Sequence, residues 1–199
     1  YYYKATYMIR AKNFKSIEQY RYWNENQVKY WVDHDEKINF NFSEIKKILF
    51  KKININLTSS ILDIGCGSGY TSKICSNLLG IKGKVLGVDI SLPLLKLFNK
   101  KYKSIKNIKC KHADIETYAL PPNTFDLVIS RFGVMFFQNP NVAFANIYKS
   151  LKNKGSFTFV CWTDFKYNQL FSIPVEVVTH ITGIKKPRIT RNAGPFSLN

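Results

Sequence analysis

Three glycines at alternate positions, Gly65, Gly67 and Gly69, constrain the fold of this chain more than any other feature. They follow an apolar strand pattern that ends in an acid, Asp63, and a helical pattern begins directly after them. Strand, glycine loop and helix in this order are typical of an open α/β sheet, which presents backbone to a nucleotide-like ligand at the carboxyl end of its first strand. Glycine is needed there because a side chain would block the ligand or forbid a positive φ angle.

The spacing of the glycines distinguishes between possible ligands. A dinucleotide-binding fingerprint, G-x-G-x-x-G, would place its third glycine at position 70, where this chain has Tyr70. The glycine stands at position 69 instead, so the loop reads D-x-G-x-G-x-G from Asp63 to Gly69. This form resembles motif I of the class I S-adenosylmethionine (SAM)-dependent methyltransferases. An NAD-dependent oxidoreductase is therefore a less favoured alternative.

Four more strand patterns follow the first one, and two of them carry an acid at or just beyond the strand tip, Asp89 and Asp114. Helix starts are expected at Ser91 and Asn139, each with a proline in the first turn. Five strand–helix units in register predict an α/β fold, a Rossmann-like open and mostly parallel sheet with helices on both faces. The four patterns span residues 83–91, 107–116, 125–130 and 151–162.

The acids at the strand tips indicate how the cofactor expected from the resemblance, SAM, would be held. An acid at the end of the second strand accepts hydrogen bonds from ribose hydroxyls in Rossmann-like sheets, which is the role expected for Asp89. The resemblance assigns Asp114 to the exocyclic amine of the adenine and Ile115 to a face of its ring. It implies no metal, and no catalytic residue is legible. The full set of expected cofactor-binding residues is Asp63, Gly65, Cys66, Gly67, Gly69, Asp89, Ile90, Asp114, Ile115 and Ser130.

Two further segments extend the resemblance, which covers roughly residues 16–199. Residues 130–162 are similar to the region after strand four in the small-molecule branch of the family, the type 11 group. That group includes quinone-biosynthesis and sterol-type C-methyltransferases. Residues 20–39 resemble leader helices that many of these enzymes fold over the cofactor. We therefore expect a leader over residues 1–52, with helices at 16–34 and 41–52, and a SAM-binding domain over residues 53–199.

Three side chains near this expected site are candidates for function. Trp23 and Trp31 are eight residues apart and would share one face of a continuous helix. The simplest interpretation is that these tryptophans pack against the rest of the protein. The resemblance, however, places such leader aromatics against the cofactor pocket. Arg131 directly follows the fourth strand, at the ligand end of the sheet. It would either dock an anion of the substrate or form a salt bridge to the leader, and the sequence leaves both open.

The formal net charge of +17 and the pI of about 9.7 raise the question of a nucleic-acid partner. Lysines outnumber arginines about five to one and are spread along the chain, as a genome rich in A and T would produce. Enzymes that methylate a nucleobase amine carry two prolines and an aromatic after strand four, where this chain reads SRFG. The sequence therefore disfavours an RNA methyltransferase and favours a small-molecule methyl acceptor as the partner.

The cysteines and the lengths of the apolar runs indicate in which cellular compartment the protein is expected. The four cysteines, at positions 66, 75, 110 and 161, include no C-x-x-C pair, which predicts reduced thiols in an intracellular, cytoplasmic protein. The three histidines are scattered, so a zinc site is not expected. No apolar run approaches the roughly 18 to 20 residues of a membrane span. Oligomeric state cannot be read from these features.

The chain departs from the family at its carboxyl end. The family sheet has seven strands in the order 3-2-1-4-5-7-6, and only five are recognisable here. We therefore expect a carboxyl-terminally truncated domain that lacks strands six and seven, with strand five as an open, aggregation-prone edge. The predicted function is transfer of a methyl group from SAM to a small molecule. The alternative is an inactive or split fragment that binds SAM without turnover.

Overall fold

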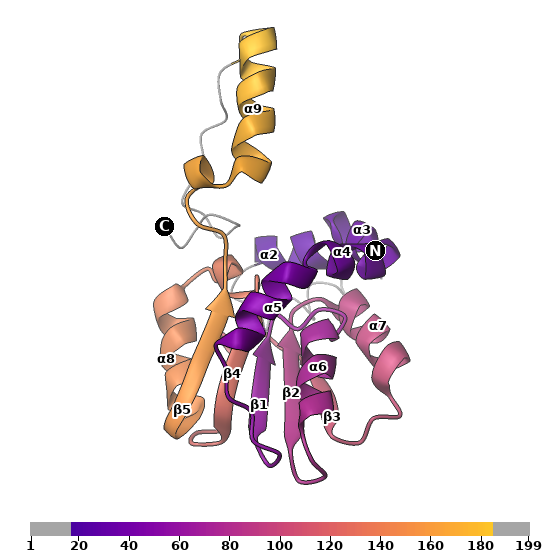
Figure 1. The fold of residues 1–199 in the computed structure, drawn as a ribbon, viewed down its shortest axis with the longest axis vertical. Helices are drawn as coiled ribbons and strands as arrows, with labels where there is room; N and C mark the ends of the chain where they lie inside the picture. Colours follow the sequence, from indigo (N-terminus) through magenta and orange to yellow (C-terminus); the bar gives the residue numbers. More distant parts are fainter. Residues whose placement is uncertain (1–16, 185–199) are drawn as a thin grey trace, which may run out of the picture.

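The computed structural model of the protein describes residues 17–184. Its five strands form one sheet in the order β3-β2-β1-β4-β5 (Figure 1). This arrangement confirms the predicted α/β class and the Rossmann-like strand order. The strands are β1 (Ser60–Ile64), β2 (Lys84–Asp89), β3 (Ile108–His112), β4 (Phe125–Arg131) and β5 (Leu151–Val160).

All neighbouring strands are parallel, so their carboxyl ends lie at one edge of the sheet. At this edge Asp89 of β2 stands in register with His112 of β3. The chain order runs one way from β1 to β3 and the other way from β4 to β5, so the switch point lies between β1 and β4. Ligands of open α/β sheets bind in the crevice outside such a point.

Helices cover both faces of the sheet, as the alternation of buried side chains in the strands requires. Ile61 of β1 packs in a cluster with Leu49, Cys75 and Phe98, which come from the helices of one face. The adjacent Leu62 packs in a second cluster on the opposite face. Helices α5 (Ser43–Lys51), α6 (Tyr70–Leu78) and α7 (Leu92–Tyr102) cover the first face, and α8 (Pro140–Ser150) covers the second.

The two expected helix starts are confirmed. The Ser91 hydroxyl accepts a hydrogen bond from the Leu94 backbone N–H at 3.4 Å and caps α7. The Asn139 side chain accepts one from the Val142 N–H at 3.3 Å and caps α8. In both helices the proline follows the cap, where a missing N–H costs nothing.

Leader helices lie over the carboxyl edge of the sheet (Figure 1). The expected continuous helix over 16–34 is wrong, because a π-helix and a bend at Gln27 interrupt it. Asn24 attaches the π-helix to the segment after β2. Its side chain donates to the Ile90 carbonyl at 3.0 Å and accepts from the Leu92 N–H at 2.9 Å. The leader elements are α2 (Ile17–Arg21), η1 (Tyr22–Asn26), α3 (Val28–Asp33) and α4 (Asp35–Asn41).

Two connections differ from the sequence expectation. Between β3 and β4 the described chain forms turns and no helix, so one of the five strand–helix units lacks its helix. The strand pattern over residues 151–162 contains an irregularity inside β5, where Leu151 already pairs with Phe125 and Lys154 has a φ of 66°.

Beyond β5 the chain forms a short 3-10 helix, η3 (Phe165–Tyr167), and then α9 (Gln169–Thr182), which extends away from the sheet (Figure 1). In the described part of the chain β5 pairs with β4 alone. The expected tail over residues 185–199 lies outside the described residues. Between residues 17 and 184 no helix has both the length and the apolar character that a membrane crossing demands.

Candidate functional site

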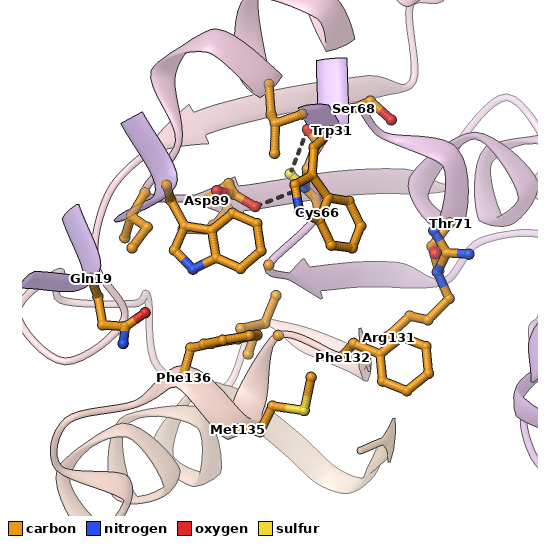
Figure 2. Close-up of a pocket in the computed structure, with 18 of the residues that line it drawn as sticks. Gln19, Trp31, Cys66, Ser68, Thr71, Asp89, Arg131, Phe132, Met135 and Phe136 are labelled. Atoms are coloured by element: carbon orange, nitrogen blue, oxygen red, sulfur yellow. Dashed lines mark hydrogen bonds between the residues drawn. The ribbon is translucent and has the colours of Figure 1, made fainter. Parts of the chain in front are cut away.

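A cavity of about 450 Å³ lies between the carboxyl edge of the sheet and the leader helices. Its lining combines the glycine loop, the ends of β2 and β4, and the segments that follow β3 and β5. Figure 2 shows side chains from the leader and from the β4 end facing one another across it. The volume lies within the range of roughly 300 to 1,000 Å³ that is usual for small-molecule sites.

The three glycines have different reasons to be glycine, although each has a positive φ, of 66°, 53° and 86° in chain order. A Cβ added at Gly65 would lie 2.7 Å from the Gly133 Cα, and one at Gly69 would lie 2.3 Å from the Phe98 ring. Both positions are therefore fixed by packing. A Cβ at Gly67 would meet only the Leu94 Cδ1, at 3.8 Å, so the backbone there is open to the cavity.

Asp89, at the end of β2, holds the glycine loop in place. One carboxylate oxygen accepts the Gly67 N–H at 2.7 Å, and the other accepts the Ser91 N–H at 2.7 Å. Burial raises the pKa of the Asp89 carboxyl, and these two hydrogen bonds oppose the rise. Each carboxylate oxygen has a second lone pair, so Asp89 can still accept hydrogen bonds from the cavity that it lines.

Three of the expected site residues support the loop from behind. Asp63 is 1% exposed and accepts the Ser72 hydroxyl of α6 at 2.5 Å. Burial raises the pKa of Asp63 to about 7. The Ser130 hydroxyl donates to the Ile64 carbonyl at 2.7 Å, and Gly69 caps the start of α6. None of these three lines the cavity.

Serine and cysteine side chains also determine which face of α6 is buried. The sequence pattern favours Ile74, Leu78 and Leu79, yet Leu78 is 48% exposed. The buried side chains of α6 are Thr71, Ser72, Cys75 and Ser76. A polar face is buried because Asp63 needs the Ser72 hydroxyl as a donor.

The segment after β3 forms another part of the lining. Asp114 and Ile115 are both buried and both line the cavity, and one Asp114 oxygen accepts the Glu116 N–H at 2.9 Å. Glu116 was not among the expected site residues. Its two carboxylate oxygens accept the N–H groups of Gln138 at 2.6 Å and Asn139 at 2.8 Å. Glu116 therefore joins the β3 end to the start of α8. Its position next to Asp114 and Ile115, two expected site residues, could have indicated from the sequence that it belongs to the site.

Aromatic side chains form two groups around the cavity. In the first, Trp23 lies 5.5 Å from Trp31 and 5.0 Å from Phe136 between ring centroids. The two tryptophans therefore meet despite the interrupted helix, and both line the cavity. The second group, which we call the aromatic wall, lies at the β4 and β5 ends and consists of Phe42, Phe132, Trp162 and Phe171.

Phe132 adopts an unusual backbone conformation in this wall. Its φ is 65°, a region that bulky residues rarely occupy. The Phe132 N–H donates to the Val160 carbonyl at 2.8 Å, and its ring stacks on Trp162 with centroids 4.7 Å apart. Such strained residues cluster at ligand sites.

Arg131, the last residue of β4, contacts the leader. Its Nη2 donates to the Asn39 Oδ1 at 2.6 Å, so within the described residues Arg131 contacts the leader through a hydrogen bond. Asn39 in turn donates to the Asp35 carbonyl at 2.9 Å. The Asp35 carboxylate accepts from the Ser68 hydroxyl and from Lys101 of α7. The sequence carried no signal for the pairs of Asp35 with Ser68 and Lys101, because their members lie 33 and 66 positions apart.

Of the ten expected residues, the structure gathers seven in the cavity lining: Gly65, Cys66, Gly67, Asp89, Ile90, Asp114 and Ile115. The Cys66 thiol is buried, and burial raises its pKa well above the usual value. Within residues 17–184 no three His, Cys, Asp or Glu side chains gather as they would around a metal ion.

Comparisons with known proteins agree on one family. The type 11 model of the methyltransferase domain matches residues 62–159. A demethylmenaquinone methyltransferase of Staphylococcus epidermidis is 25% identical over 179 residues, which cover 87% of this chain and 64% of that protein. One from Staphylococcus saprophyticus is 28% identical over 125 residues, covering 63% of this chain and 44% of that protein. This chain therefore spans roughly half to two thirds of the length of these curated relatives.

A solved structure shows the same fold. The SAM-dependent methyltransferase of Mesorhizobium loti aligns with a TM-score of 0.53 and 24% identity. The alignment covers 57% of this chain and 50% of that one. Agreement at this level of identity concerns the fold alone.

Alanine at Gly65 and at Gly67 separates packing from ligand binding. Both variants carry the strain of a positive φ, roughly 1–2 kcal/mol, so they control for each other. We expect Gly65→Ala to lower the melting temperature further, because its Cβ would meet the Gly133 backbone. Gly67→Ala should instead lose affinity for S-adenosylhomocysteine in calorimetric titration. Affinity within a few-fold of the original would place the ligand away from this loop.

Alanine at Asp89 tests the carboxylate at the β2 end. Charge-assisted hydrogen bonds contribute roughly 1.5 to 3 kcal/mol each, so loss of those to a ribose should weaken S-adenosylhomocysteine binding on the order of 100-fold. The melting temperature should also fall, because the Gly67 and Ser91 N–H groups lose their acceptor. Asp126→Ala is the control, since Asp126 accepts the Ser60 N–H at 2.8 Å and does not line the cavity. An Asp89 variant with unchanged affinity would contradict the assignment.

Proposed function

The chain belongs to the class I SAM-dependent methyltransferases, and we propose that it transfers the methyl group of SAM to an apolar small molecule. One observation supports this proposal most directly. A single cavity is lined at one end by the glycine loop, Asp89 and Asp114, and at the other by the aromatic wall. The first end suits a nucleoside, and the second suits an apolar acceptor.

The residues of the first end fit SAM. The backbone at Gly67 leaves open space where a side chain would stand, as close approach of a ligand requires. Asp89 would accept the ribose hydroxyls, Asp114 the adenine amine, and Ile115 would cover the ring. Bound SAM supplies an electrophilic methyl group. The protein then contributes mainly position and exclusion of water.

The aromatic wall supports an apolar, planar acceptor. Phe132 and Trp162 stack with an interplanar angle of 19°, and Phe42 and Trp162 meet edge to face. Flat rings of this kind bind aromatic ligands through offset and edge contacts. The curated relatives are named for demethylmenaquinone, a substrate of this chemical type. We therefore propose a quinone-like or similar aromatic acceptor and no nucleic acid.

The division of the chain at residue 52 remains part of this proposal, and the contacts of the leader suggest a role for it at the cavity. Gln19, Trp31 and Asn39 all line the cavity, and the Trp23 carbonyl accepts the Ser91 hydroxyl at 2.7 Å. The leader would thus cover the cofactor and exclude water. A cytoplasmic location remains part of this proposal.

Methyl transfer from radiolabelled SAM to a panel of reduced naphthoquinones, phenols and short RNA tests the function. We expect transfer to apolar aromatic acceptors. Phe132→Gly should lower turnover while S-adenosylhomocysteine binding stays within a few-fold, because glycine tolerates the positive φ and removes only the ring. Tight S-adenosylhomocysteine binding with no transfer to any acceptor would favour the alternative, a protein that binds SAM without turnover. Transfer to RNA alone would contradict the proposed acceptor class.

A further inference from the structure

Arg131 has one buried nitrogen that nothing in the described chain satisfies. Its Nη1 has no hydrogen-bond partner within residues 17–184, whereas its Nη2 is held by Asn39 at 2.6 Å. The guanidinium lies over the Tyr70 ring, 5.2 Å from its centroid, and Arg131 lines the cavity. In Figure 2 its side chain extends toward Thr71.

A buried charged donor without an acceptor is costly, and native proteins retain few of them. Two acids, Asp63 and Asp35, attract the charge of Arg131 but hydrogen-bond to other side chains. Asp63 accepts from Ser72, and Asp35 accepts from Ser68 and Lys101. Burial lowers the pKa of Arg131, and the negative charges of Asp63 and Asp35 oppose this shift. An anionic ligand would supply the missing acceptor.

Two positive features, the start of α6 and Lys46, lie near the guanidinium together with the Asp63 and Asp35 carboxylates that attract it. Helix α6 begins at Tyr70 with no side-chain cap and no acid in its first turn, although the buried Asp63 carboxylate accepts from Ser72 there. The Lys46 ammonium also lies over the Tyr70 ring, at 5.9 Å. Thr71, in the first turn, lines the cavity. Arginine and a helix amino terminus together suit a carboxylate.

Two anions could occupy this position, one on the cofactor and one on the acceptor. The guanidinium contacts Tyr70 of α6 and Asn39 of the leader, and both neighbour the glycine loop. Its contacts thus belong to the end of the cavity that suits the nucleoside, although Phe132 of the aromatic wall is the next residue in the chain. This placement favours the cofactor.

We propose that Arg131, together with the first turn of α6, binds the carboxylate of the methionine portion of SAM. The inference rests on the proposed function, since it requires SAM in the cavity. Asn39 is then a positioning residue, which holds the guanidinium through Nη2 and leaves Nη1 for the ligand. Through Asn39, binding of the methionine portion of SAM would be coupled to the position of the leader.

Two ligands that differ in the amino-acid portion test this inference. S-adenosylhomocysteine carries the carboxylate, and methylthioadenosine has the same nucleoside and thioether without it. Calorimetric titration should show that Arg131→Met weakens S-adenosylhomocysteine on the order of 10- to 100-fold, the range for one or two charged hydrogen bonds. Methylthioadenosine should change by less than about 3-fold, which is under 1 kcal/mol.

Two more variants serve as controls. Arg131→Lys keeps the charge and should restore part of the affinity for S-adenosylhomocysteine. Lys152→Met removes a cation that pairs with Asp126 at 2.8 Å and does not line the cavity, so it should alter neither ligand.

Each other outcome would overturn the inference. Equal losses for both ligands would mean that Arg131 acts through the fold of the loop. Unchanged S-adenosylhomocysteine binding with a raised KM for the acceptor would assign Arg131 to an acceptor anion. If the original protein binds both ligands equally, the carboxylate contributes nothing and only the proposed function survives. If it binds neither, the proposed function fails as well.

Discussion

The rest of the site depends on the hydrogen bonds that the Asp89 carboxylate accepts from the backbone. Its two oxygens each accept one backbone N–H, from Gly67 on one side and Ser91 on the other. The glycine loop after β1 is thereby fixed to the start of α7 after β2. Ser91 then caps α7 and donates to the Trp23 carbonyl, so the same contact carries on to the leader. A short acidic side chain at a strand tip thus aligns a loop, a helix and a lid.

The leader is tied to the sheet at both ends of the cavity. On the β2 side Asn24 bonds to the backbone of Ile90 and Leu92. On the β4 side Asn39 holds Arg131, and Asp35 accepts from Ser68 and Lys101. These are polar contacts at the margin of an aromatic cavity, so they can open at a lower cost than an apolar core would impose. That arrangement suits a lid that admits and releases small molecules.

The sequence predicted the features that depend on local chemistry. The glycine loop, the strand tips at Asp89 and Asp114, and the helix starts at Ser91 and Asn139 each follow from short-range rules. The structure differs where distant residues decide. Asn24 pairs with residues 66 and 68 positions away, and these pairs have no sequence signature. The sequence allowed a contact of Arg131 with the leader but could not identify its partner, which lies 92 positions away. The polar buried face of α6 likewise depends on Asp63, which lies in a different element.

A crystal structure with S-adenosylhomocysteine bound tests the central claim most directly, that the cavity at the carboxyl edge is the cofactor site. We expect the ribose at the Asp89 carboxylate, the adenine between Asp114 and Ile115, and the amino-acid end at Gly67. The leader should cover the ligand through Trp23 and Trp31. A ligand bound elsewhere, or one in the cavity with its adenine against the aromatic wall, would contradict the account.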